Sequence, residues 1–171
     1  MISLINKTTK NLKKKEIVEI CKIKNLEWKY GFNSQKSWFL KYIKSYDFHN
    51  MLIIDKKISA YTCLRKRTCK YDKKNIKYLL FDTLIVRNSA RKKGIGRLMM
   101  DFNSHIIHKK NLLSFLVCRK KTVNFYKKNN WTVIEKKKFK IMDNNYPNQY
   151  GMIFNYKKFK KMKGLYLWTN K

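Results

Sequence analysis

The spacing of apolar and polar residues predicts strands and helices along the first part of the chain. Residues 2–5 are a short apolar run that is expected to form a strand. Residues 15–26 repeat apolar positions with a helical period, and Ser34 suits the N-cap of a second helix. Residues 51–54 and 58–64 are strand-length apolar runs separated by a short polar segment, which predicts a hairpin.

The middle of the chain carries the longest apolar run. Residues 78–86 are expected to form a buried central strand, and the spacing of residues 98–107 predicts a helix after it. A polar connection is expected over residues 67–75 and leads into this strand. Two shorter strands, at about residues 132–135 and 151–156, would complete the sheet.

A cationic, glycine-bearing loop lies between the central strand and the following helix, and it reads Arg91-Lys92-Lys93-Gly94-Ile95-Gly96-Arg97. Glycine has no Cβ, so the backbone can approach a ligand closely at Gly94 and Gly96. The free N–H groups and the positive dipole end of the first helical turn favour an anion. A polyphosphate fits such a loop, and the alternative is an ordinary strand–helix connection with solvated lysines. The three-glycine dinucleotide fingerprint and the Gly-Lys-Ser/Thr ending of NTPase phosphate loops are both missing.

Two motifs around this loop resemble those of the GCN5-related N-acetyltransferases, the GNAT family. Residues 84–96 resemble the family's acetyl-CoA motif, in which an apolar strand end and a short loop precede Arg/Gln-x-x-Gly-x-Gly/Ala at a helix start. Residues 112–118 resemble the family's next strand, and residues 122–131 resemble its Ala-x-x-Leu/Phe-Tyr-x-x-x-Gly-Phe helix and turn. Asn130 replaces the usual glycine of that turn, and asparagine tolerates a left-handed backbone better than most residues.

The resemblance implies an α/β (α+β) fold, with a GNAT-like mixed, mostly antiparallel central sheet flanked by helices and a βαβ acetyl-CoA-binding centre. The two motifs cover about residues 76–136, and the N-terminal part matches the family only in its general layout. With 171 residues, one proline and five glycines, the chain is expected to be one domain, residues 1–171, without a flexible linker. Residues 157–171 form a basic tail whose apolar end is expected to pack back or to meet a partner.

The resemblance also implies acetyl-CoA as the cosubstrate. Backbone amides at the end of the central strand would bind the pantetheine arm and polarise the thioester carbonyl, and the cationic loop would hold the pyrophosphate. Arg119 stands where many members have an asparagine that contacts the pantetheine arm, and an arginine there could still reach a phosphate. The cofactor-binding residues implied in this way are Leu84, Ile85, Val86, Arg91, Lys92, Lys93, Gly94, Ile95, Gly96, Arg97 and Arg119. We expect no metal, because the cysteines form no Cys-x-x-Cys pair and no histidine stands at zinc-finger spacing.

Asp82 is the candidate general base. Acetyl transfer to an amine needs a neutral nucleophile, and a lysine-like ammonium with a pKa of about 10.4 must first lose a proton. Asp82 lies nine residues before Arg91, where many members of the family carry a glutamate. Alternation along the strand puts it on the same face as Leu80 and Leu84. The alternative is a structural carboxylate paired with a lysine.

Tyr126 is the candidate general acid. The resemblance implies that it lies near the thioester sulfur and protonates the leaving thiolate; the alternative is a core tyrosine. His49 and Trp38 are the candidate acceptor-binding residues. His49 precedes a strand that would border the acceptor cleft, and it titrates near neutral pH, so it is also an alternative base. Trp38 would line this cleft with Trp28 and Tyr46, although core packing explains all of them equally well.

The chain is strongly basic, with 42 Lys and Arg residues against 10 Asp and Glu and a net charge of +32. This charge suits an acceptor that is anionic overall, such as an amino sugar on a nucleotide diphosphate, and would repel polyamines and aminoglycosides. The scattered lysines also match the codon bias of an AT-rich genome. Two alternatives remain: acetylation of a protein or peptide amine, and a nucleic-acid-binding module. The second lacks a helix-turn-helix spacing and an RNP-type aromatic motif, which argues against nucleic acid.

The sequence predicts neither a membrane span nor a secretory leader. No apolar run approaches the roughly 20 residues of a membrane-spanning helix, and the first residues lack an apolar signal core. Cys21, Cys63, Cys69 and Cys118 are expected to be reduced thiols, which indicates a cytoplasmic protein. The sequence leaves a homodimer open.

Overall fold

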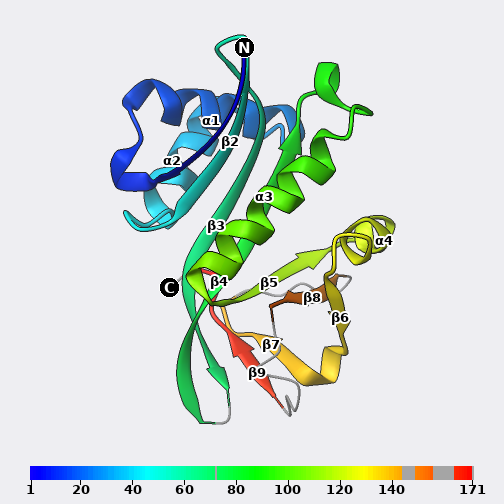
Figure 1. Ribbon diagram of the computed structural model, residues 1–171. Coiled ribbons are helices and arrows are strands. Elements are labelled where there is room, and N and C mark those ends of the chain that lie inside the picture. Colours follow the sequence, from blue (N-terminus) through cyan, green and yellow to red (C-terminus); the bar gives the residue numbers. More distant parts are fainter. Residues whose placement is uncertain (72, 144–148, 156–163, 171) are drawn as a thin grey trace. The chain divides into compact units, whose positions relative to one another are not determined.

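The computed structural model of the protein describes residues 1–71, 73–143, 149–155 and 164–170 (Figure 1). The chain forms two compact units, which are described separately: Met1–Arg65 with Asp82–Asn103, and Lys66–Phe81 with Ser104–Lys171. Three elements contribute residues to both units: β3 (Lys57–Tyr71), β4 (Lys74–Val86) and α3 (Ile95–Lys110). In the described part of the chain, no helix is long and apolar enough to cross a membrane.

The first unit contains an antiparallel sheet in the order β1-β2-β3. Strand β1 (Ile2–Thr8) pairs with β2 (Phe48–Ile54) over its whole length, and β2 continues through a tight turn into β3. Asp55 and Lys56 form this turn with φ angles of 48° and 64°, as a two-residue hairpin loop requires. The predicted hairpin is confirmed, and both of its strands are longer than their apolar runs.

Two helices of the first unit follow each other between β1 and β2. α1 (Lys14–Glu27) confirms the first predicted helix. α2 (Phe32–Tyr42) is present, but Ser34 is not its N-cap, because the helix begins earlier. Gly31 caps it instead: its φ of 87° turns the chain into the helix, and its carbonyl accepts the N–H of Gln35 at 3.1 Å.

Alternate side chains of β2 and β3 face opposite sides of the sheet and pack against different helices. Figure 1 draws α1 and α2, in blue and cyan, beside β2. One face joins these two helices in a core that includes Ile20, Ile23, Phe39, Met51, Tyr61 and Cys63. The opposite face joins α3 in a smaller core of Leu52, Ala60 and Met99.

The prediction of a polar connection over residues 67–75 is wrong. Strand β3 continues to Tyr71, and β4 starts at Lys74. Arg67 and Cys69 are buried while the residues between and after them are exposed, which is the period of a strand with one covered face. The charged residues hide this period in the sequence, since a buried arginine looks like a polar loop residue.

The second unit contains β4, β5, β8 and β6, hydrogen-bonded in that order. β5 (Leu113–Cys118) runs parallel to β4, whereas β8 (Tyr150–Phe154) is antiparallel both to β5 and to β6 (Thr132–Ile134). α3 connects the parallel pair, so the predicted βαβ centre is confirmed. The short α4 (Val123–Lys127) precedes β6.

The last described strand closes the second unit. β9 (Leu165–Leu167) pairs antiparallel with the end of β3 and parallel with β7 (Phe139–Ile141), a strand that the sequence did not predict. The apolar end of the tail therefore packs into the sheet. Tyr156, the end of the predicted strand 151–156, and residues 157–163 lie outside the described residues.

The pairings give a mixed, mostly antiparallel sheet with helices packed against it, and the predicted fold class is confirmed. Four single-turn 3₁₀ helices complete the described secondary structure: Thr9–Asn11, Asn88–Ala90, Lys120–Thr122 and Lys136–Lys138.

Candidate active site

The cationic loop ends at the start of α3. Lys92 and Gly94 have positive φ angles of 61° and 72°, and the Gly94 carbonyl accepts the N–H of Leu98 at 3.0 Å. The helix therefore begins directly after Gly94, and the N–H groups of its first turn have no acceptor within the helix. A Cβ at Gly94 would meet no atom within 4 Å, so the approach to this loop is open. An open helix start in a lysine-rich loop fits a phosphate or pyrophosphate.

Arg91 holds the loop in the first unit. Its Nε donates to the Val86 carbonyl at 2.9 Å, and its Nη2 lies 2.9 Å from Oε2 of Glu27 in α1. Arg91 therefore shapes the loop, and its predicted contact with the cofactor stays a prediction. The other cations of the loop are exposed, and in the described part of the chain they form no ion pair: Lys92, Lys93 and Arg97.

The strand end before the loop packs on both of its sides. Ile85 belongs to the core shared with α1 and α2, whereas Leu84 and Val86 pack with Ile95 in the core on the α3 face. Their side chains join strand and helix. The predicted binding of the cofactor by their backbone, and by that of Gly96, stays a prediction.

A pocket of about 340 Å³ opens in the first unit between α1, α2 and β4. Aromatic side chains form much of its wall, and the charged side chains that line it are Lys24 and Asp82. Apolar walls with a few polar groups are typical of small-ligand sites, and this volume suits a small molecule. Trp38, predicted to bind the acceptor, lines this pocket. The lining residues are Lys24, Trp28, Tyr30, Ser34, Gln35, Trp38, Asp82 and Thr83.

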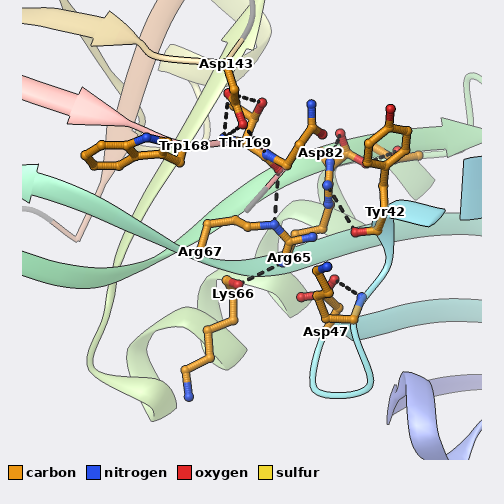
Figure 2. Close-up of polar contacts among 12 residues, drawn as sticks. Tyr42, Asp47, Arg65, Lys66, Arg67, Asp82, Asp143, Trp168 and Thr169 are labelled. Atoms are coloured by element: carbon orange, nitrogen blue, oxygen red, sulfur yellow. Dashed lines mark hydrogen bonds and ion pairs between the residues drawn. The ribbon is translucent and has the colours of Figure 1, made fainter.

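Asp82 has an arginine, not a lysine, as its partner. Its Oδ1 lies 3.6 Å from Nη1 of Arg65, which is 2% exposed, and Nη2 of Arg65 donates to the Tyr42 carbonyl at 3.3 Å (Figure 2). The side chain of Asp82 is 21% exposed, so it reaches the pocket while it is paired. The position of Asp82 agrees with both hypotheses, because the carboxylate forms an ion pair and also lines the pocket.

The predicted shared face of Asp82 and Leu84 is wrong. Asp82 lines the pocket with residues of α1 and α2 and pairs with Arg65, whereas Leu84 packs on the opposite side, in the core with α3. The alternation of β4 is therefore interrupted between them. Local irregularities of this kind re-aim side chains and are common beside active sites.

Lys24 is a pocket residue that the sequence reasoning missed. It is 6% exposed, and its Nζ lies 3.6 Å from the centre of the Trp38 ring. Burial lowers the pKa of its ammonium, and the charge of Asp82 opposes that change. A signal was present, because Ile17, Ile20, Cys21 and Lys24 follow the helical i, i+3, i+4, i+7 spacing of a buried face.

His49 does not line the pocket, so the structure argues against its predicted roles in acceptor binding and as an alternative base. Its side chain is fully buried, Nδ1 is 2.8 Å from the Tyr61 hydroxyl, and Nε2 is 2.8 Å from the Thr9 hydroxyl. Burial, and then the charge of Lys24, lowers the pKa of His49 to about 3. A neutral imidazole with both nitrogens engaged is a core residue, as expected for a strand that is covered by α1 and α2.

Tyr126 lies in α4 of the second unit within an aromatic cluster. Its ring centroid is 6.2 Å from those of Phe81 and Trp131. Burial raises the pKa of its phenol above that of an ordinary tyrosine, so the hydroxyl keeps its proton at neutral pH. Arg119 is exposed before the turn that leads into α4. Asn130 has a φ of 65°, which confirms the expected left-handed turn.

The fold matches those of solved acyltransferases. An acyl-CoA N-acyltransferase from Pseudomonas aeruginosa aligns with a TM-score of 0.67 at 13% identity, over 90% of this chain and 99% of that one. A GNAT-family acetyltransferase from Staphylococcus aureus Mu50 gives 0.62 at 14% identity, over 90% and 98%. An aminoglycoside 6'-N-acetyltransferase in complex with coenzyme A gives 0.65 at 11% identity, over 88% and 96%.

Neither a protein-family model nor a curated protein matches the chain by sequence. At the identities of the solved structures, the likeness establishes the fold. The chain therefore has the fold of the GNAT acetyltransferases, which confirms the fold that the resemblance implied.

Proposed function

We propose that the chain is an acetyl-CoA-dependent N-acetyltransferase that acetylates the amine of a small molecule by direct attack on the thioester. The observation that carries this proposal is the course of β4, which lines the pocket at Asp82 and ends at the cationic loop after Val86. Four residue steps of a strand cover at most about 13 Å between these two residues. CoA carries its pyrophosphate and its thioester at opposite ends of an extended arm, so a ligand of this shape suits both features.

Solved proteins with the same fold support the proposal. One is an acyl-CoA N-acyltransferase and another is an aminoglycoside N-acetyltransferase bound to coenzyme A. Within this chain, the open helix start at Gly94 and the exposed Lys92 and Lys93 are suitable groups for the pyrophosphate.

The proposed mechanism divides the proton transfers between two residues. When bound, acetyl-CoA supplies the acetyl group as a thioester. Asp82 accepts the proton of the acceptor ammonium, directly or through water, because only the neutral amine attacks. N–H groups of residues 84–86 polarise the thioester carbonyl. Tyr126 donates a proton to the departing thiolate, a task that suits a buried phenol that is still protonated at neutral pH.

The acceptor in this proposal is anionic overall. Lys24 is a buried cation that lines the pocket, and in the described part of the chain its ammonium forms no ion pair. An amino sugar on a nucleotide diphosphate meets this requirement, and a protein or peptide amine is the alternative. All four cysteines are buried free thiols, which suits a cytoplasmic enzyme.

Two measurements test the proposed function. Calorimetry with CoA should show binding, and acetyl-CoA turnover should depend on a small amine from an acceptor panel that also contains peptides. Binding of an oligonucleotide without any binding of CoA would favour the nucleic-acid alternative. Turnover of peptides alone would favour the protein amine.

A further inference from the structure

The ammonium of Lys24 is buried at the pocket without a close counter-ion. In the described part of the chain, Nζ of this 6% exposed residue forms no hydrogen bond and no ion pair. It lies instead over the face of Trp38, 3.6 Å from the ring centre. A cation–π contact offsets part of the lost hydration, but a buried charge without an anionic partner remains costly.

The carboxylate of the pocket is engaged elsewhere. Asp82 lies 3.6 Å from Arg65. The charge of Asp82 also opposes the lowering of the Lys24 pKa by burial, but Asp82 makes no direct contact with that ammonium. Asp82 therefore pairs with Arg65 and not with Lys24, and in the described part of the chain no carboxylate contacts the ammonium of Lys24 directly. An anionic ligand is the group that this arrangement lacks.

We propose that Lys24 binds an oxyanion, a carboxylate or a phosphate, carried by the same small molecule whose amine is acetylated. This inference rests on the proposed N-acetyltransferase function and names its acceptor class, a compact amine with its own acidic group. Lys24 and Asp82 line one pocket of about 340 Å³, so the acidic group and the amine lie close together in the acceptor. Trp28 and Trp38 cover the apolar part of the molecule.

Amine-free probes test this anion site without catalysis. We expect phenylacetate or phenyl phosphate to bind at least tenfold more tightly than neutral phenylacetamide, measured by calorimetry or by the fluorescence of the pocket tryptophans. The two anions distinguish a carboxylate site from a phosphate site. Equal affinity for the anions and the amide, or no binding of any probe at millimolar concentration, overturns the proposal.

Two lysine variants on α1 make the test specific. Lys24→Met removes the charge, leaves an unbranched side chain one atom shorter, and should abolish the preference for the anion. Lys22→Met removes the same charge from an exposed side chain of the same helix and should leave the preference intact. Circular dichroism and CoA affinity show whether both variants are folded. A Lys24→Met protein that is folded and still prefers the anion contradicts the proposal.

Matched acceptors separate this inference from the proposed function. With acetyl-CoA, β-alanine is compared with its amide, and phosphoethanolamine with ethanolamine. We expect the acidic member of at least one pair to have a KM at least tenfold lower, and Lys24→Met to raise that KM more than it lowers kcat. Acetylation without this preference refutes the anion site alone. Lys24-dependent binding of the probes without any acetylation refutes the proposed function alone.

Discussion

Asp82 of β4 and Arg65 of β3 form an ion pair at the wall of the pocket, with 3.6 Å between Oδ1 and Nη1 (Figure 2). Arg65 is buried, whereas Asp82 keeps about a fifth of its side chain exposed. The pair therefore joins the inside of the first unit to the surface that a ligand would contact. Mutation of Arg65 tests what the pair contributes to the stability of the protein, and mutation of Asp82 tests its proposed role in catalysis.

Replacing Arg65 should destabilise the protein. Arg65→Met removes the cation and leaves the carboxylate of Asp82 without its partner, so we expect the free energy of unfolding to fall by about 3 kcal/mol. Lys22→Met, which breaks an exposed ion pair with Glu19, should cost less than about 1 kcal/mol. Urea denaturation measures both, and equal losses would show that burial of the Asp82 pair adds nothing.

Replacing Asp82 should remove the base. Under the proposed function, Asp82→Asn lowers kcat/KM by about 10²–10⁴-fold at neutral pH. The loss should shrink at high pH, where more of the acceptor amine is already neutral. Steady-state kinetics across this pH range make the test.

Tyr126→Phe is the contrast to this variant. A thiolate still needs a proton when the amine is free, so the defect of Tyr126→Phe should persist at high pH while CoA affinity stays nearly unchanged. Full activity of Asp82→Asn at neutral pH would mean that a water chain or another group is the base.

Replacing Gly94 should weaken CoA binding without unfolding the chain. A Cβ at Gly94 would meet no protein atom within 4 Å, so the side chain of Gly94→Val should project into the space where we expect the pyrophosphate. Calorimetry should show at least a tenfold loss of CoA affinity. The positive φ of 72° adds backbone strain of about 1–2 kcal/mol.

Gly31→Val controls for that strain. Gly31 also has a positive φ, 87°, and equally open surroundings. Its variant should lose a similar amount of stability, and its CoA affinity should be unchanged. If the two variants bind CoA equally well, the loop is not the pyrophosphate site.

The burial of His49 should make the protein less stable in mild acid. Burial lowers the pKa of His49 to about 3, whereas an imidazole in the unfolded chain titrates near 6.5. The folded state binds this proton less readily than the unfolded chain. The contribution of His49 to the free energy of unfolding is therefore fully present above pH 6.5 and is lost as the pH falls toward 3. Within this window, we expect the free energy of unfolding to fall by about 1.4 kcal/mol for each pH unit of acidification.

Urea denaturation at pH 7 and pH 5 measures this slope. Within that range the lowered pKa values of Glu16 and Asp143 add little, because those carboxyls are ionised in both states. His49→Gln should flatten the slope, and His105→Gln, at an exposed histidine, is the control. A wild-type protein of constant stability from pH 7 to 5 would contradict the prediction.

Filling the space at Gly151 should strain the second unit. A Cβ at Gly151 would lie 2.6 Å from Cζ of Phe139 and 3.1 Å from Cε2 of the buried Phe115. Gly151→Ala should therefore lower the unfolding free energy by about 1–3 kcal/mol. At Gly164 the closest atom would be 3.5 Å away, an ordinary contact, so Gly164→Ala should be close to neutral. Thermal unfolding compares the two variants, and equal melting temperatures would refute the clash.

Among the predictions from the sequence that differ from the structure are the polar connection over residues 67–75, the N-cap of α2, and the position of His49. Charged residues between positions 67 and 75 masked the strand period of β3 and β4. Ser34 was predicted to be the N-cap of α2, but the N-cap is Gly31, whose positive φ the sequence does not reveal. His49 looked like a residue of the cleft, because a histidine beside a strand has the same local signature whether it is exposed or buried.

By itself, the sequence determined the local structure: α1, the β2–β3 hairpin, the central strand, and the glycine-bearing loop before α3. Each depends on periodicity or turn chemistry within about a dozen residues, which a single chain displays directly. Only the tertiary structure decided that Arg65 faces Asp82, that His49 is fully buried, and that Lys24 lies over Trp38. These neighbours come from different elements, and strand pairing and helix packing bring them together. No local pattern encodes which distant side chain will fill, neutralise or line a given space.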